Sequence, residues 1–147
     1  MKINTSRFGE MEIEEESIIE FRHGIPAFEE LKRYIIISLE GDDNFYWLQS
    51  VDDGDIAFIL ADPFNFTVDY EPVLSDSILK ELQIEKEEDV LVLTMLVVPD
   101  EIENMTANLA APIVININKK LGKQVILTEG DYPVRHPVFV STLREGE

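Results

Sequence analysis

Apolar residues follow two patterns along this chain, strict alternation and short continuous runs, and both are typical of β-strands. Met11 and Ile13 alternate with glutamates, which predicts a strand with one solvated face. The β-branched run 34–39 predicts a strand that is covered on both faces, and the apolar run 90–98 predicts a buried strand. The other predicted strands are 45–51, 56–61, 112–118 and 124–128, with a short extended segment at 64–70.

Turn-forming residues separate these strands. Acidic and glycine-containing clusters predict turns at 40–44 and 52–55, the second of them a tight hairpin. A lysine-rich loop is expected at 119–123, and a polar connection at 100–111. Beyond Gly130, two prolines and sparse apolar residues predict an irregular C-terminal tail.

One stretch has helical rather than strand spacing. Ile78, Leu79 and Leu82 share one face, and Ser75 or Asp76 can cap the N-terminus. Many short strands, one short helix and no alternation of strands with long helices predict an all-β, mainly antiparallel fold. The length of 147 residues fits a single β-barrel-like domain, 1–147, of which 130–147 form the tail.

The charge balance narrows the possible partners. The chain has 30 acidic and 12 basic side chains, a formal net charge of −18, which argues against direct binding of nucleic acid or of an anionic membrane. A basic protein partner is compatible with this charge, but on charge alone the favoured interpretation is that the acidic excess keeps the protein soluble. The N-terminus lacks an apolar signal region, and 90–98 is too short to span a bilayer, so a cytoplasmic protein is expected.

The sequence offers few residues that could support catalysis. The chain has no cysteine, so thiol nucleophiles and disulfides are excluded. His23 and His136 each stand beside a turn former and outside any nucleophile motif, which predicts surface or loop positions. The acidic cluster 52–55 lacks the spacing of a calcium loop, and no glycine-rich phosphate loop is present. We therefore expect no enzyme, no metal site and no cofactor.

Two segments stand out for binding. The segment 106–113 sets Asn108 among small residues, where either a partner backbone could approach or Asn108 could bond its own backbone in a tight turn. Phe64, Phe66 and Tyr70 form an aromatic cluster beside two prolines, which suits core packing as well as a docking surface. The residue pattern favours the local turn for Asn108 and leaves both alternatives open for the aromatic cluster.

A series of landmarks runs along the chain in a fixed order. They are 21–28, 47–50, 61–63, Phe66, 69–70, 106–113 and Asn116. In their order and spacing these landmarks resemble the FliW flagellar assembly factors over nearly the whole chain. One departure is Pro26-Ala27-Phe28, where the family more often has a glycine before the phenylalanine, and it concerns the geometry of that turn.

The resemblance implies a small antiparallel β-barrel without catalytic activity, a monomer by itself, that binds flagellin in the cytoplasm. It also implies a second, alternative partner, CsrA, a small dimeric RNA-binding translational repressor. Binding would stop CsrA from repressing flagellin mRNA, and accumulated flagellin would displace and free CsrA. The acidic protein could occupy the RNA site of CsrA or bind beside it, and the resemblance favours the second, non-competitive route.

The positions expected to include the partner-facing surface come from these landmarks, although several could hold the fold instead. They are Gln49, Asp62, Pro63, Phe66, Asp69, Tyr70, Asn108, Ala111 and Pro112. Two other classes of protein remain open. A small-ligand or sugar-binding barrel would have a deep pocket lined by Trp47 and Phe66. A glycosidase-like enzyme would need two carboxylates about 5 to 10 Å apart in a cleft.

Overall fold

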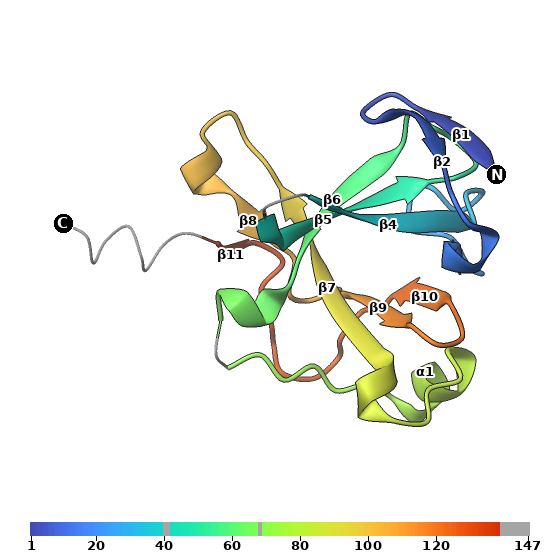
Figure 1. The fold of residues 1–147 in the computed structure, drawn as a ribbon. Helices are drawn as coiled ribbons and strands as arrows, with labels where there is room; N and C mark the ends of the chain where they lie inside the picture. Colours follow the sequence, from blue (N-terminus) through green and yellow to red (C-terminus); the bar gives the residue numbers. More distant parts are fainter. Residues whose placement is uncertain (40–41, 68, 139–147) are drawn as a thin grey trace.

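Seven strands wind into a closed barrel in the part of the chain that the computed structural model describes, residues 1–39, 42–67 and 69–138 (Figure 1). Around the barrel they follow the order β3 (Ile19–Glu20), β4 (Arg33–Leu39), β5 (Asp42–Ser50), β6 (Ala57–Ala61), β7 (Val90–Val97), β9 (Ile113–Asn116) and β10 (Leu121–Gln124). A parallel contact between β10 and β3 closes the ring, and the other neighbours are antiparallel. The predicted all-β, mainly antiparallel barrel is confirmed.

The remaining strands lie outside this ring. β1 (Lys2–Thr5) and β2 (Gly9–Glu12) form a hairpin. Ile3 of this hairpin and Ile13, which follows it, pack against Ile35 of β4 in the barrel wall. β8 (Thr106–Ala107) pairs with the end of β7, and β11 (His136–Pro137) pairs with β8. These strands extend the sheet beyond the barrel without opening it.

The barrel interior is filled by side chains. Phe21, Tyr34, Leu48 and Leu60 are completely buried there, with further apolar residues from β7 and β9. Because side chains alternate along a strand, β7 also turns Val90 and Val92 toward an outer layer. The prediction that 90–98 is a buried strand thus holds for residues 90–96, which pack on both faces, while Val97 and Val98 are exposed.

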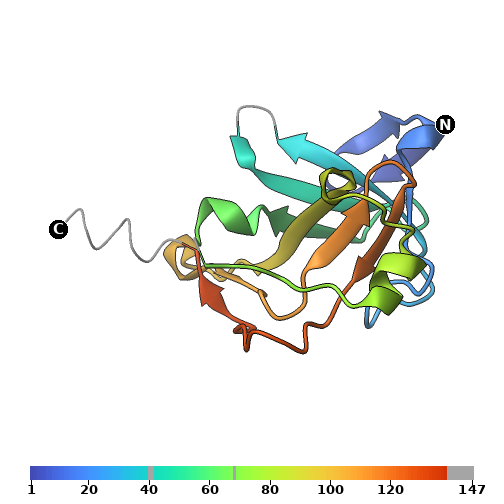
Figure 2. The ribbon, with the colours of Figure 1, turned by 90° about the horizontal axis from the view of Figure 1, so that it is seen from below.

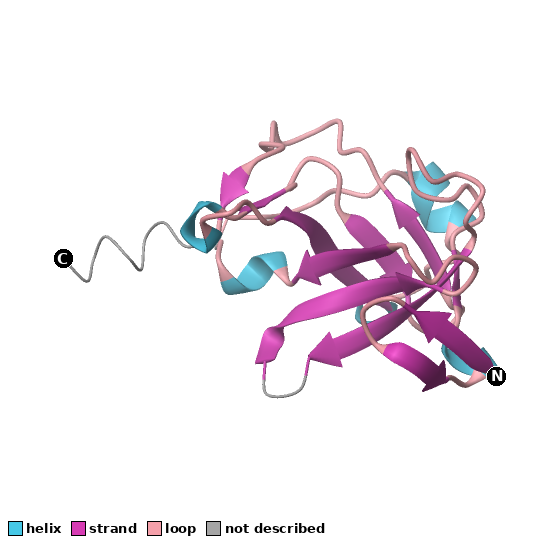
Figure 3. Cartoon of the chain, turned by 90° about the horizontal axis from the view of Figure 1, so that it is seen from above, coloured by secondary structure: helices cyan, strands magenta, loops and turns pink. Residues whose placement is uncertain are grey.

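The outer layer carries the one α-helix of the described residues, α1 (Asp76–Glu81). Ser75 caps it by accepting a hydrogen bond from the Ile78 amide at 3.3 Å, as the sequence predicts. Figure 3 shows how small the helical share is: besides α1 there are the 3-10 turns η1 (Glu15–Ser17), η2 (Pro63–Asn65), η3 (Glu87–Asp89) and η4 (Ile102–Asn104).

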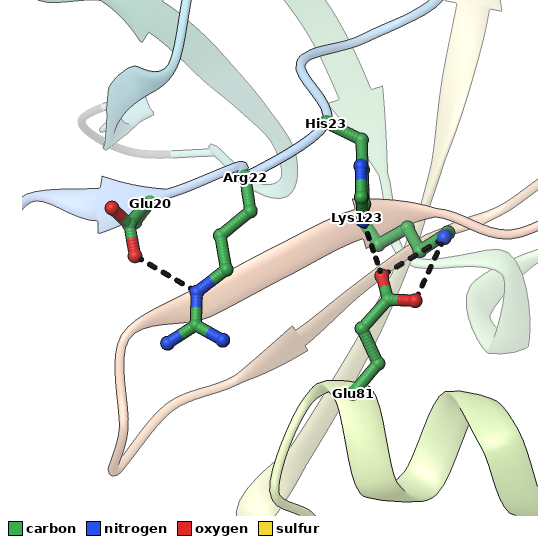
Figure 4. Close-up of polar contacts among 5 residues, drawn as sticks. All are labelled: Glu20, Arg22, His23, Glu81 and Lys123. Atoms are coloured by element: carbon green, nitrogen blue, oxygen red, sulfur yellow. Dashed lines mark hydrogen bonds and ion pairs between the residues drawn. The ribbon is translucent and has the colours of Figure 1, made fainter.

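A polar cluster fastens α1 to the barrel (Figure 4). Glu81 of α1 accepts two hydrogen bonds from the Lys123 ammonium of β10, at 2.8 and 3.1 Å. His23 Nε2, in the turn after β3, lies 3.6 Å from the same carboxylate. The helix is therefore held to two neighbouring elements by one side chain.

Two predicted segments are wrong. No strand forms among the described residues of 64–70, and 64–65 instead belong to a 3-10 turn that Asp62 caps and that begins at Pro63, whose ring fixes the backbone angle needed there. The return strand begins at Leu121 rather than at 124, since the Asn116 side chain accepts hydrogen bonds from the amides of Asn118 and Lys119 and tightens the connection.

Three boundaries shift for similar reasons. β5 begins at Asp42 inside the predicted turn 40–44, of which 40 and 41 lie outside the described residues. The connection 100–111 contains η4 and β8, and β11 interrupts the irregular tail, whose residues 139–147 lie outside the described part. None of the described helices is long and apolar enough to cross a bilayer.

Candidate partner-binding site

The segment 106–113 forms a closed turn that Asn108 holds together. Its Oδ1 accepts hydrogen bonds from the amides of Ala110 and Ala111, each at 3.1 Å. The carbonyl of Ala111 in turn accepts from the Gln124 side chain at 3.1 Å. Pro112 is buried, and its carbonyl pairs with the Val125 amide at 2.9 Å. Of the two alternatives for Asn108, the structure shows the local turn.

Tyr70 braces this turn from the other side. Its hydroxyl donates to the Leu109 carbonyl at 2.7 Å, and its ring meets the Tyr132 ring edge-on at 4.7 Å. Only 3% of Tyr70 is exposed, and this burial raises the pKa of its hydroxyl well above the ordinary range. Tyr70 and the 106–113 turn therefore form one structural unit, in which Tyr70 is buried and Asn108 is half-buried.

Gln49 is completely buried in β5. Its Nε2 donates to the carbonyls of Ser50, Gly54 and Ile56, at 3.0 to 3.2 Å, and so pins the predicted hairpin between β5 and β6. Gly54 fits there because a Cβ would come within 1.8 Å of the Asn4 carbonyl oxygen. The structure thus gives Gln49 a fold-holding position, out of reach of a partner in this conformation.

The residues around η2 divide between interior and surface. Pro63 is buried, while Asp62 is half-buried and caps the turn with its carboxylate. Phe66 is half-buried, and its ring lies 6.0 Å from the His136 ring, so His136 is less of a surface residue than predicted. Asp69 is exposed. Of the nine predicted positions, Asp69 is the one fully at the surface.

A groove of about 820 Å³ runs beside η2, and sequence reasoning missed it as a site. It is lined by residues of η2, of 70–74, of α1 and the turn after it, and of β7. Among the predicted positions, Asp62 and Tyr70 contribute to its wall. The signal available in the sequence was the acidic run 85–89, which alone is equally typical of a solvated turn.

A smaller groove of about 410 Å³ contains Trp47. The Arg7 guanidinium covers the indole at 4.4 Å from the ring centre, and Phe8 meets its edge at 6.1 Å. Phe66 does not line this groove. A ligand-binding barrel would need Trp47 and Phe66 in one pocket, whereas in the described part of the chain the groove at Trp47 is formed without Phe66 and side chains fill the barrel interior.

Comparison with known proteins decides the family. The family model described as "FliW protein" matches residues 2–138. A flagellar assembly factor FliW of Clostridium novyi (strain NT) is 48% identical over 139 residues, which cover 95% of this chain and 97% of that protein. One of Caldicellulosiruptor saccharolyticus is 47% identical over 132 residues, or 90% of this chain and 86% of that protein. This chain belongs to the FliW family.

A solved structure agrees with that assignment. The crystal structure of a flagellar assembly factor FliW superposes with a TM-score of 0.88 at 44% identity and covers 95% of this chain and 97% of the other. The resemblance drawn from the landmark residues is thereby confirmed. The FliW landmarks Gln49, Tyr70 and Asn108 are residues that hold this fold, so family membership does not by itself locate the binding surface.

Proposed function

We propose that this protein binds flagellin and, alternatively, CsrA in the cytoplasm, and that binding CsrA relieves the repression of flagellin mRNA. The observation that carries the proposal is the match of nearly the whole chain to flagellar assembly factors, in sequence and in fold. The protein would act as a regulatory binding protein rather than as an enzyme. When flagellin accumulates, it would occupy the protein and release CsrA.

The charge of the chain supports a basic partner. A formal net charge of −18 would steer a basic RNA-binding protein toward this surface and would speed their association. The same field would disfavour RNA in the complex, because each phosphate would approach a strongly negative surface. Antagonism of CsrA therefore does not require that this protein fill the RNA site.

Titration calorimetry with purified flagellin and, separately, with CsrA tests the proposal. We expect both partners to bind, and the affinity for CsrA to fall as the salt concentration rises, because ions screen exposed charges over about 8 Å at physiological ionic strength. If flagellin or CsrA fails to bind at low salt, the proposal is overturned. Salt-independent binding of CsrA would refute the electrostatic part of the reasoning alone.

In vitro translation of flagellin mRNA tests the regulatory step. CsrA should reduce the yield of flagellin, this protein should restore it, and added purified flagellin should restore repression. The matched control is a translation of the same mRNA without CsrA, in which this protein should change nothing. Relief of translation that persists in excess flagellin would contradict the alternative binding of the two partners.

A further inference from the structure

An unusually long connection joins two neighbouring strands of the barrel. β6 ends at Ala61 and its antiparallel neighbour β7 begins at Val90, so 62–89, or 28 residues, lie between them. Antiparallel neighbours need a turn of only about two to five residues. Figure 2 shows this connection passing from η2 to α1 along the outside of the barrel. Long connections in compact domains commonly carry function.

This connection and β7 together enclose the 820 Å³ groove. Its lining residues lie at 62–92, and nine of them are apolar or aromatic. They are Phe64, Tyr70, Pro72, Leu74, Leu79, Ile84, Val90, Leu91 and Val92. The groove thus offers an apolar floor on the outside of a barrel whose interior is already filled.

The rim of the groove has the opposite character. Asp62, Glu71, Glu85 and Glu87 contribute four carboxylates to the lining, against the single ammonium of Lys86. Glu71, Glu85 and Glu87 are exposed. Charges at the rim of an apolar groove select partners by complementarity and speed their approach. A negative rim of this kind repels phosphate-bearing metabolites and attracts lysine and arginine.

Phe64 supplies a further contact at the η2 end of the groove. Its side chain is 52% exposed, although its ring lies 5.9 Å from that of Tyr70. Tyr70 is itself fixed by the Leu109 carbonyl, so Phe64 stands on a rigid base. An exposed aromatic ring on a rigid base is typical of an interface anchor, because little side-chain entropy is lost on binding.

We propose that this groove receives an apolar segment of a partner protein that has lysine or arginine residues on both flanks. An amphipathic helix or an extended segment of this composition matches both the floor and the rim. The inference rests on the proposed function, and of its two partners the basic one, CsrA, is the occupant. Flagellin would then be bound mainly outside the groove.

Charge reversal at the rim with a matched control tests the groove. The double variant Glu85→Lys/Glu87→Lys changes the rim, and Glu10→Lys/Glu16→Lys changes two exposed glutamates on β2 and η1. Each pair shifts the formal net charge from −18 to −14, since each reversal adds two charges. In low-salt calorimetry we expect the rim variant to bind CsrA about tenfold or more weakly, and the control within about threefold of the unmodified protein.

Phe64→Ala gives a second test that does not depend on charge. It should weaken CsrA binding at high as well as low salt, because it removes apolar contact area. Thermal unfolding should show that all variants remain folded, and because Phe64 is half-exposed its loss leaves the core intact. Flagellin binding by the same variants should change little.

The outcomes separate the groove from the proposed function. If the unmodified protein binds CsrA and the rim and control charge variants lower the affinity for CsrA equally, the overall charge of the protein is responsible and the groove is refuted as the site. If the rim variant and Phe64→Ala bind CsrA normally, the groove is likewise refuted while the proposed function stands. If the rim variant and Phe64→Ala bind CsrA normally but no longer bind flagellin, the assignment of CsrA to the groove is wrong. If the unmodified protein binds no CsrA, the proposed function fails together with this assignment.

Discussion

Replacing Tyr34 by phenylalanine should stabilise the protein. The Tyr34 side chain is completely buried in the barrel, and its hydroxyl has no hydrogen-bond partner among the described residues. The ring itself is well packed, 5.1 Å from Phe21 and 6.2 Å from Phe58. Phenylalanine keeps the ring contacts and removes a buried polar group whose burial costs about 1–3 kcal/mol. We therefore expect Tyr34→Phe to raise the free energy of unfolding by about 1–2 kcal/mol at pH 7.

The same substitution should remove a loss of stability in alkali. Burial, with smaller contributions from Asp52 and Glu30, raises the pKa of Tyr34 from 10.0 to about 12. Because the pKa of Tyr34 is raised in the folded state, folding favours the neutral hydroxyl over the ionised one. The stability of the wild-type protein is therefore unaffected by this titration below pH 10 and falls as the pH rises toward 12. Two pH units correspond to about 3 kcal/mol, a loss of stability that the Tyr34→Phe variant cannot show.

Chemical unfolding of both proteins at a series of pH values measures this difference. The stability gap should be nearly constant from pH 7 to pH 9 and should widen between pH 10 and pH 12 in favour of the variant. Comparison at each pH cancels the titration of the groups that both proteins share. A variant less stable by 1 kcal/mol or more at pH 7, or a gap that stays constant through pH 12, would refute the reasoning about a buried, unpaired hydroxyl.

Substitutions at four further positions test local features, each by its effect on the free energy of unfolding in urea. Ala27→Gly should stabilise by about 0.5–1 kcal/mol, because Ala27 has a φ of 77°, a conformation that glycine adopts without strain; a destabilised variant would contradict this. Asn116→Ala should cost about 3 kcal/mol, since the buried amide donates to two backbone carbonyls and accepts from two amides, and a cost under 1 kcal/mol would show that those groups find other partners. Gly122→Ala should cost about 1–3 kcal/mol, because its Cβ would come within 2.6 Å of the buried Phe21 ring, and an unchanged midpoint would mean that the ring can move. Asn108→Asp should leave the stability nearly unchanged, because a carboxylate oxygen can accept the same two hydrogen bonds, whereas Asn108→Ala should lower the free energy of unfolding by about 1 kcal/mol. Equal losses of stability in the two variants would show that the turn hydrogen bonds do not contribute.

The local elements could be predicted from the sequence because short-range rules determine them. The helix cap at Ser75, the hairpin at 52–55 and the burial of β7 follow from side-chain chemistry and periodicity within a few residues. The closure of the barrel by β10 and β3 could not be predicted this way. It joins Leu121 to Glu20, some hundred residues apart, and the local pattern of neither segment identifies its partner.

The departure at Ala27 shows how a family pattern can carry physical information. The resemblance indicated glycine as the more frequent residue there, and the structure places Ala27 in the left-handed region at a φ of 77°. Glycine has no Cβ to strain in that conformation, so the family pattern reported the backbone geometry before the structure did. Alanine at this position therefore carries a local conformational cost in this chain.

The residues that identify the family and the residues that would bind a partner are largely different sets, for a physical reason. Gln49, Asn108 and Asn116 satisfy backbone groups inside the fold, and such roles allow few replacements, so they make distinctive landmarks. An acidic rim needs only net charge above an apolar floor, which glutamates at several positions can supply. The acidic run 85–89 is thus unremarkable as a motif, yet it lies beside an apolar groove once the 62–89 connection folds back on β7. We therefore expect partner recognition to depend more on the acidic rim and apolar floor of the groove, where Asp62 and Tyr70 are landmarks, than on buried landmarks such as Gln49 and Asn116.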